Sequence, residues 1–120
     1  MRRILIVEND EGMRRRLTRR LSGAFAVRCV ATPDEARRLF AWDEFDAVVG
    51  DLPPSLGLDF LADVRRRMPR ALRVLMSVAE GPDMPPADPP WEVLLRKPFR
   101  LDALLHLLER NFDEGEGAPP

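Results

Sequence analysis

The sequence has little of several features that would place it in a particular class of protein. Its 120 residues include one cysteine, Cys29, so an internal disulfide is excluded and a reducing compartment is favoured. Lys and Arg (19) nearly balance Asp and Glu (20), so we expect no direct binding to nucleic acids or membranes. No apolar run is long enough to cross a bilayer, and the run from Ile4 to Val7 is too short for a signal peptide. We therefore expect a cytoplasmic protein.

The chain does contain a regular alternation of short apolar runs and helical patterns. Its length is that of one domain, and 45% of its residues are hydrophobic. Continuous apolar runs predict buried strands at 4–7, 26–31, 45–51, 73–79 and 93–97. Apolar residues at helical spacing predict helices at 13–21, 33–40, 58–68 and 101–112. Strands that alternate with helices predict an α/β fold with a parallel sheet covered on both faces.

The connection between the fourth and fifth strands departs from this alternation. Its sequence is EGPDMPPADPP, with prolines at positions 82, 85, 86, 89 and 90. Prolines at this density remove backbone donors and clash with the preceding helical turn. We therefore predict that residues 81–90 form an extended loop, with no helix of more than one turn, where a fourth helix would be expected. Residues 114–120 are polar and rich in Gly and Pro, so we expect a domain at 1–113 followed by a flexible tail or linker remnant.

Polar side chains follow three of the predicted strands at the point where each strand ends. Glu8, Asn9 and Asp10 follow the first strand, Asp51 ends the third, and Lys97 ends the fifth. Ligands of open parallel sheets bind at this edge. Carboxylates that converge there repel one another unless a cation joins them; Mg²⁺ prefers oxygen ligands, and a lysine can hold a phosphate. The pattern predicts that Asp51 accepts a phosphoryl group beside a metal ion and that Lys97 holds the phosphoryl oxygens.

Five segments carry a resemblance to a known family. In order, ILIVENDEGMRRRL, FDAVVGDLPP, GLDFLADVRRRMP, RVLMSVAE and RKPFRLDALL resemble the CheY-like receiver domain of bacterial two-component response regulators, over residues 3–112. The resemblance implies a flavodoxin-like, doubly wound, five-stranded parallel sheet with strand order 2-1-3-4-5. It also implies a phosphorelay role in signal transduction, with a sensor histidine kinase or another signalling protein as partner and an output domain or a homodimer beyond it.

The resemblance also assigns roles to individual residues. Asp51 falls on the phosphoacceptor and Lys97 on the family's lysine. Glu8 and Asn9 fall on the acidic pair that handles Mg²⁺, and the backbone carbonyl of Pro53 falls on a further metal ligand. These five positions would form one site, with Asp51 itself among the metal ligands.

Several positions depart from the family's pattern. Asn9 stands in place of a ligating aspartate and brings no charge, so we expect Mg²⁺ binding to be weak or lost. The switch hydroxyl after strand four falls on Val78, or on Ser77 if the match is shifted by one, and both positions stay open. Leu94 stands at the aromatic switch position, and the segment from Asp51 to Gly57 is shorter than in the family. These departures predict an atypical receiver with a remodelled readout face.

Alternative functions remain open. The retained Asp51 and Lys97 favour phosphorylation, whereas Asn9, Leu94 and the proline-rich loop favour a pseudo-receiver that acts by protein binding alone. A Mg²⁺-dependent phosphohydrolase would need a second acid where Pro53 stands. An FMN-binding protein would need a Ser-, Thr- or Gly-rich phosphate loop in place of the acidic ENDEGM. We therefore expect no enzyme activity beyond self-phosphorylation and dephosphorylation.

Overall fold

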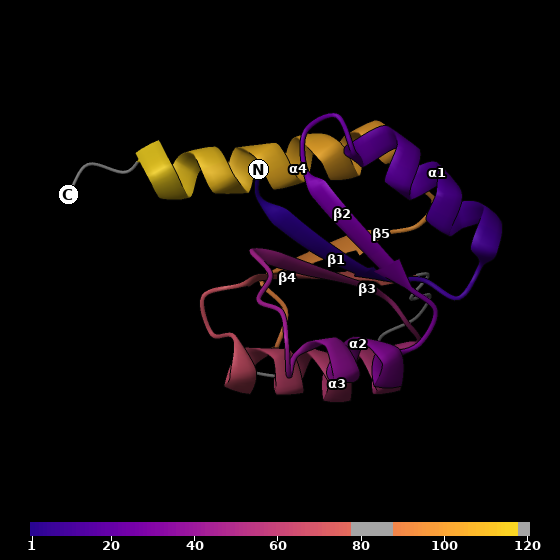
Figure 1. Ribbon diagram of the computed structural model, residues 1–120, viewed down its shortest axis with the longest axis vertical. Coiled ribbons are helices and arrows are strands. Elements are labelled where there is room, and N and C mark those ends of the chain that lie inside the picture. The colour runs from indigo at the N-terminus through magenta and orange to yellow at the C-terminus, as the bar shows by residue number, and fades with distance from the viewer. Residues whose placement is uncertain (78–87, 118–120) are drawn as a thin grey trace.

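The protein is an α/β sandwich in which one parallel sheet lies between two layers of helices (Figure 1). The computed structural model describes residues 1–77 and 88–117. The strand order is β2-β1-β3-β4-β5, so the predicted fold class and order are confirmed. The strands are β1 Arg3–Val7, β2 Ala26–Val30, β3 Ala47–Asp51, β4 Leu72–Ser77 and β5 Val93–Arg96. The helices are α1 Glu11–Leu21, α2 Pro33–Leu39, α3 Pro54–Arg67 and α4 Leu101–Gly117.

Helix starts follow the capping residues in the sequence. The Asp10 side chain accepts a hydrogen bond from the backbone N–H of Met13 (2.7 Å) and so caps α1. Thr32 caps α2 in the same way, and a proline occupies the first helical position. Pro53 precedes α3 and offers no side-chain cap, because it has no polar side-chain atom. The connection is short, and α3 begins three residues after the end of β3.

The core has two halves, one on each face of the sheet. Along β1, Ile4 and Ile6 pack toward α1 and α4, while Leu5 and Val7 pack toward α2 and α3. All four side chains are fully buried. This burial on both faces is what the continuous apolar run predicted. No helix in the described part of the chain has the length and apolar content that crossing a membrane requires.

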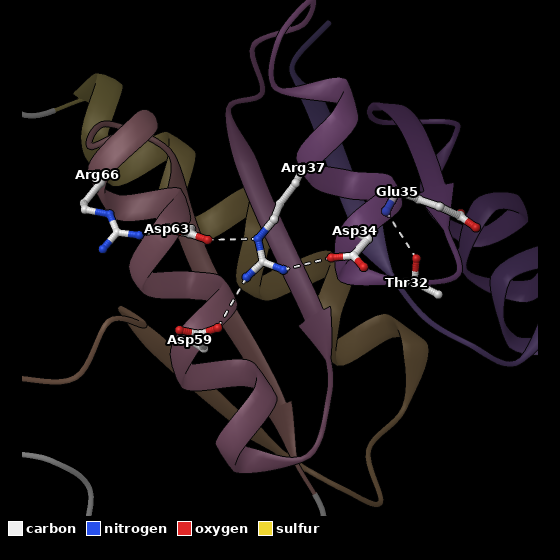
Figure 2. A network of polar contacts seen from close by, with 7 residues as sticks. All are labelled: Thr32, Asp34, Glu35, Arg37, Asp59, Asp63 and Arg66. Atoms are coloured by element: carbon white, nitrogen blue, oxygen red, sulfur yellow. Dashed lines mark hydrogen bonds and ion pairs between the residues drawn. The ribbon is translucent and has the colours of Figure 1, made fainter.

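An arginine joins the two helices on one face of the sheet (Figure 2). Arg37 of α2 lies 2.8 Å from Asp63 and 3.6 Å from Asp59, both on α3, and 3.3 Å from Asp34 on its own helix. Its guanidinium carbon also lies 5.6 Å from the ring centre of the buried Phe60. α2 has seven residues, too few to be stable as an isolated helix, so these contacts and its packing hold it in place.

Two predictions concern segments that the structure covers only in part. The predicted extended loop at 81–90 falls mostly on residues 78–87, which lie outside the described residues. Residues 88–92 contain no helix, and the fourth helix of the described chain is the closing one after β5. That closing helix continues to Gly117, past the predicted boundary at 113, so residues 114–117 are helical. The boundary of the domain remains a prediction.

Close approach of α3 to β4 depends on a glycine. A Cβ atom at Gly57 would lie 2.6 Å from Cδ1 of Leu75, a buried residue of β4. Real Cβ contacts are not that short, so any side chain here would force Leu75 or α3 to move. Gly57 therefore sets the distance between the helix that follows Asp51 and the sheet.

We predict that Gly57→Ala lowers the free energy of unfolding by about 1 kcal/mol. Overpacking a filled core costs about 1–3 kcal/mol, and the gain in helix propensity offsets about 1 kcal/mol of that. The matched control is Gly23→Ala, since no atom lies within 4 Å of a Cβ at Gly23. It should change stability by less than about 0.5 kcal/mol. Urea unfolding measures both, and a neutral or stabilising Gly57→Ala would show that α3 shifts without cost.

Candidate functional site

The carboxyl ends of three strands bring an acid, a second acid and a lysine together. Glu8 follows β1, Asp51 ends β3 and Lys97 follows β5. Lys97 Nζ donates a hydrogen bond to Asp51 Oδ2 at 2.6 Å, with the two side chains 30% and 15% exposed. The backbone N–H of Lys97 donates to the carbonyl of Ser77 (2.8 Å), and the Lys97–Pro98 peptide bond is cis. The lysine is therefore fixed by the sheet on one side and by the proline on the other.

Glu8 is the most buried acid of the site, with 3% of its surface exposed. Its Oε1 accepts a hydrogen bond from the backbone N–H of Asp10 (3.2 Å), whereas Oε2 has no donor. The pKa of Glu8 is raised to about 7, chiefly by burial and then by hydrogen bonding to Asp51 and repulsion from its charge, while the backbone N–H of Asp10 and the charge of Lys97 act the other way. An ionised Asp51 carboxylate is also an acceptor, so it contacts Glu8 favourably only when a proton or a cation lies between them.

The other polar residues after β1 contribute less to this site. The Asp10 carboxylate is used to cap α1, and Asn9 is exposed. In residues 1–77 and 88–117, no group of three or more His, Cys, Asp or Glu side chains is arranged to hold a metal ion. The charged groups available to a metal ion here are therefore the carboxylates of Glu8 and Asp51.

These two carboxylates suit a hard divalent cation. A buried carboxylate oxygen without a donor, next to a second carboxylate, is a position where Mg²⁺ would satisfy both. The neutral oxygen ligands that the sequence predicts are the side-chain amide of Asn9 and the backbone carbonyl of Pro53. The Pro53 carbonyl already accepts a hydrogen bond from the backbone N–H of Gly57 (2.8 Å), so one of its lone pairs is engaged within α3. These oxygens suit Mg²⁺, but they carry less negative charge than a set with an aspartate in place of Asn9.

Two of the predicted switch positions lie on neighbouring strands, Ser77 on β4 and Leu94 on the edge strand β5. Ser77 is buried at the end of β4, and Val78 lies outside the described residues, so the choice between them stays open. Leu94 of β5 is half-buried opposite Leu75 and packs on the face that carries α2 and α3.

Sequence reasoning missed the part played by Arg14. The spacing of the arginines along α1 is typical of a solvated helix face, yet Arg14 Nη1 donates to the carbonyl of Glu8 at 2.8 Å and the side chain is half-buried. Its position one turn inside a helix that follows a strand-end acid is the signal that could have identified it. The contact fixes the corner between β1 and α1, and with it the backbone of Glu8.

Comparison with known proteins gives one curated relative at low coverage. No family model matches the chain. The hydrogenase transcriptional regulatory protein HoxA of Cupriavidus necator is 32% identical over 76 residues, which is 62% of this chain. The chain spans 16% of the length of that protein.

Solved structures show the fold more completely. A CheY-like response regulator receiver domain protein from Methanospirillum hungatei has 20% identity and a TM-score of 0.83, covering 98% of both chains. The signal receiver domain of an HD domain-containing protein from Pseudomonas fluorescens has 24% identity and a TM-score of 0.81 at the same coverage. The response regulator TrrA from Thermotoga maritima, solved with Mg²⁺ and BeF, has 21% identity and a TM-score of 0.78 over 92% of this chain and 98% of its own. TrrA has also been solved with the histidine kinase ThkA. The chain therefore has the fold of receiver domains.

We predict that the metal-free protein loses stability as the pH rises from about 5 to about 8. The folded-state pKa of Glu8, about 7, lies above its usual 4.5, so the folded state holds the proton more tightly. Folding is therefore favoured most at low pH, and on the order of 2–3 kcal/mol is lost once the pH passes 7.

Glu8→Gln removes this titration and should flatten the pH dependence. Urea unfolding in a chelating buffer at pH about 5.5 and about 8 measures it. Glu11→Gln, at an exposed position on α1, is the matched control and should keep the slope of the parent protein. An unchanged slope in Glu8→Gln would mean that Glu8 does not retain a proton.

Proposed function

We propose that the chain is a signalling receiver domain in which Asp51 accepts a phosphoryl group from a sensor kinase. The observation that carries the proposal is the 2.6 Å contact from Lys97 Nζ to Asp51 Oδ2, beside the buried Glu8. The likeness of the fold to receiver domains supports it, as does the solved complex of one such regulator with a histidine kinase. Apart from phosphoryl transfer at Asp51, the role needs no enzyme activity.

We assign a role in the transfer to each of these groups. Lys97 engages Asp51 Oδ2, and we assign the other oxygen, Oδ1, as the nucleophile. Oδ1 forms a bond to phosphorus as the phosphorus–nitrogen bond of a phosphohistidine breaks, and the departing imidazole takes a proton from solvent. The Lys97 ammonium then binds a phosphoryl oxygen. Glu8, Asp51 and neutral oxygens would hold Mg²⁺, which would supply positive charge to offset the negative charge of the phosphoryl group.

A second candidate function is protein binding without phosphorylation. The observation that favours it is the reduced ligand set, since Asp10 is used as a helix cap and Asn9 adds no charge. In that case the Lys97–Asp51 pair ties the ends of β3 and β5 together as a structural ion pair. A phosphohydrolase is disfavoured, because Pro53 occupies the position where such a site needs its second acid.

We predict slow phosphorylation on Asp51. Incubation with a small-molecule phosphodonor and Mg²⁺ should add one phosphoryl group, seen by intact-mass measurement, and Asp51→Asn should abolish it. Asp59→Asn, which changes an exposed carboxylate of α3, is the control and should label like the parent chain. Labelling that persists in Asp51→Asn would place the acceptor elsewhere and contradict the proposal.

We further predict that Asn9→Asp strengthens Mg²⁺ binding by about tenfold or more, which corresponds to about 1.4 kcal/mol. The substitution adds a charge to the metal's ligands and hardly alters side-chain size. Mg²⁺ titration followed by amide NMR shifts measures the affinity, with Asn111→Asp on α4 as a remote control. If Asn9→Asp binds Mg²⁺ tightly and still does not label, the shortened segment after Asp51 closes the site and protein binding alone is favoured.

A further inference from the structure

A groove lies at the edge of the sheet opposite the Asp51 site. It is a hollow of about 680 Å³ between the loop that enters β3 and the loop that joins α3 to β4. We call it the amino-edge groove; its lining residues are Arg3, residues 44–46 and residues 67–71. In Figure 1 the amino-terminal ends of the strands lie at the left, away from the carboxyl ends that carry the site. A ligand in this groove would leave Asp51 accessible.

The arginines at the end of α3 differ in whether they have an acidic partner. Arg65 lies 3.2 Å from Asp88, and Arg66 pairs with Asp63. Arg67 and Arg70, which line the groove, are exposed and have no carboxylate partner among the described residues. Two cations at the groove are therefore available to an external anion.

The acids that line the groove neutralise only part of this charge. Asp46 accepts a hydrogen bond from the backbone N–H of Arg3 (2.8 Å) and lies 3.9 Å from Arg2. Arg3 also pairs with Asp43 at 3.1 Å. Glu44 is exposed and offsets one arginine, so the lining residues keep one net positive charge.

An exposed tryptophan lies in the loop that leads into this groove. Trp42 is 86% exposed, next in sequence to the Asp43 that holds Arg3. A large apolar side chain that is so exposed contributes little burial to the stability of the isolated protein. Trp and Arg are enriched among the residues that dominate the binding energy of protein interfaces. Trp42 precedes Glu44, the first groove residue of this loop, by two positions and offers an apolar contact on the approach to the groove.

We infer that the amino-edge groove binds an acidic segment of a partner protein. Carboxylates of that segment pair with Arg67 and Arg70, and an apolar side chain packs on Trp42. Arginine matches carboxylates through two parallel hydrogen bonds. A single net positive charge is too little for the many phosphate contacts on which nucleic-acid binding depends. The inference goes beyond the proposed function and does not rest on phosphorylation of Asp51.

The test titrates the full chain with a five-residue peptide that has a central leucine flanked by two aspartates on each side. Backbone amide signals of residues 40–46 and 67–71, and the Trp42 indole N–H signal, should shift saturably. The Arg67→Gln/Arg70→Gln double variant should weaken binding by about fivefold or more. Arg65→Gln/Arg66→Gln removes the same charge from the two preceding arginines of α3, which have acidic partners and do not line the groove, and should stay within about twofold.

Five outcomes would overturn the inference. The first is that the amide signals show no saturable shift. The second is that they respond equally to the same peptide with asparagines in place of aspartates. The third is that both double variants weaken peptide binding equally. The fourth is a stronger response of the same residues to polyphosphate, which would assign the groove to phosphate ligands. Shifts that depend on protein concentration without peptide would assign the groove to a second copy of this chain and also overturn it.

Discussion

Two carboxyl groups that repel each other, those of Glu8 and Asp51, determine the arrangement of this edge of the sheet. The fold puts them side by side because parallel strands end together. Each is made tolerable in a different way: Lys97 neutralises Asp51 directly, and burial keeps a proton on Glu8 up to a pKa of about 7. The cis proline, the helix cap and Arg14 hold the backbone around this pair.

A site with this charge balance can exist with or without a metal ion. Lys97 and a proton on Glu8 suffice to offset the repulsion when no cation is present. In the proposed function Mg²⁺ would have to displace that proton, with the neutral Asn9 in place of a third carboxylate. In a signalling site, a metal ion would replace the proton on Glu8, and a phosphoryl oxygen would replace the Asp51 carboxylate as the partner of Lys97. In a structural ion pair, neither exchange takes place.

The sequence was sufficient to predict the fold and the meeting of Glu8, Asp51 and Lys97 at one edge of the sheet. Apolar runs marked the strands, and the acids and lysine at strand ends follow from parallel topology. It could not predict the contact of Arg14 with Glu8, or the fit of Gly57 against Leu75, because both depend on how a helix meets a strand in space. Nor can the run of arginines at 65–67 show by itself which ones meet an acid, since partners depend on direction around the helix end.

The contacts of Arg37 make α2 and α3 one mechanical unit. Arg37 lies against Phe60, Phe60 stacks on Phe40 at 6.1 Å, and Arg67 lies over Phe40, so an unbroken column of flat groups joins the two helices. A seven-residue helix could not keep its amide protons from exchanging with solvent on its own. Through this column it shares the cooperative opening of its longer neighbour, so the layer behaves as a single foldon.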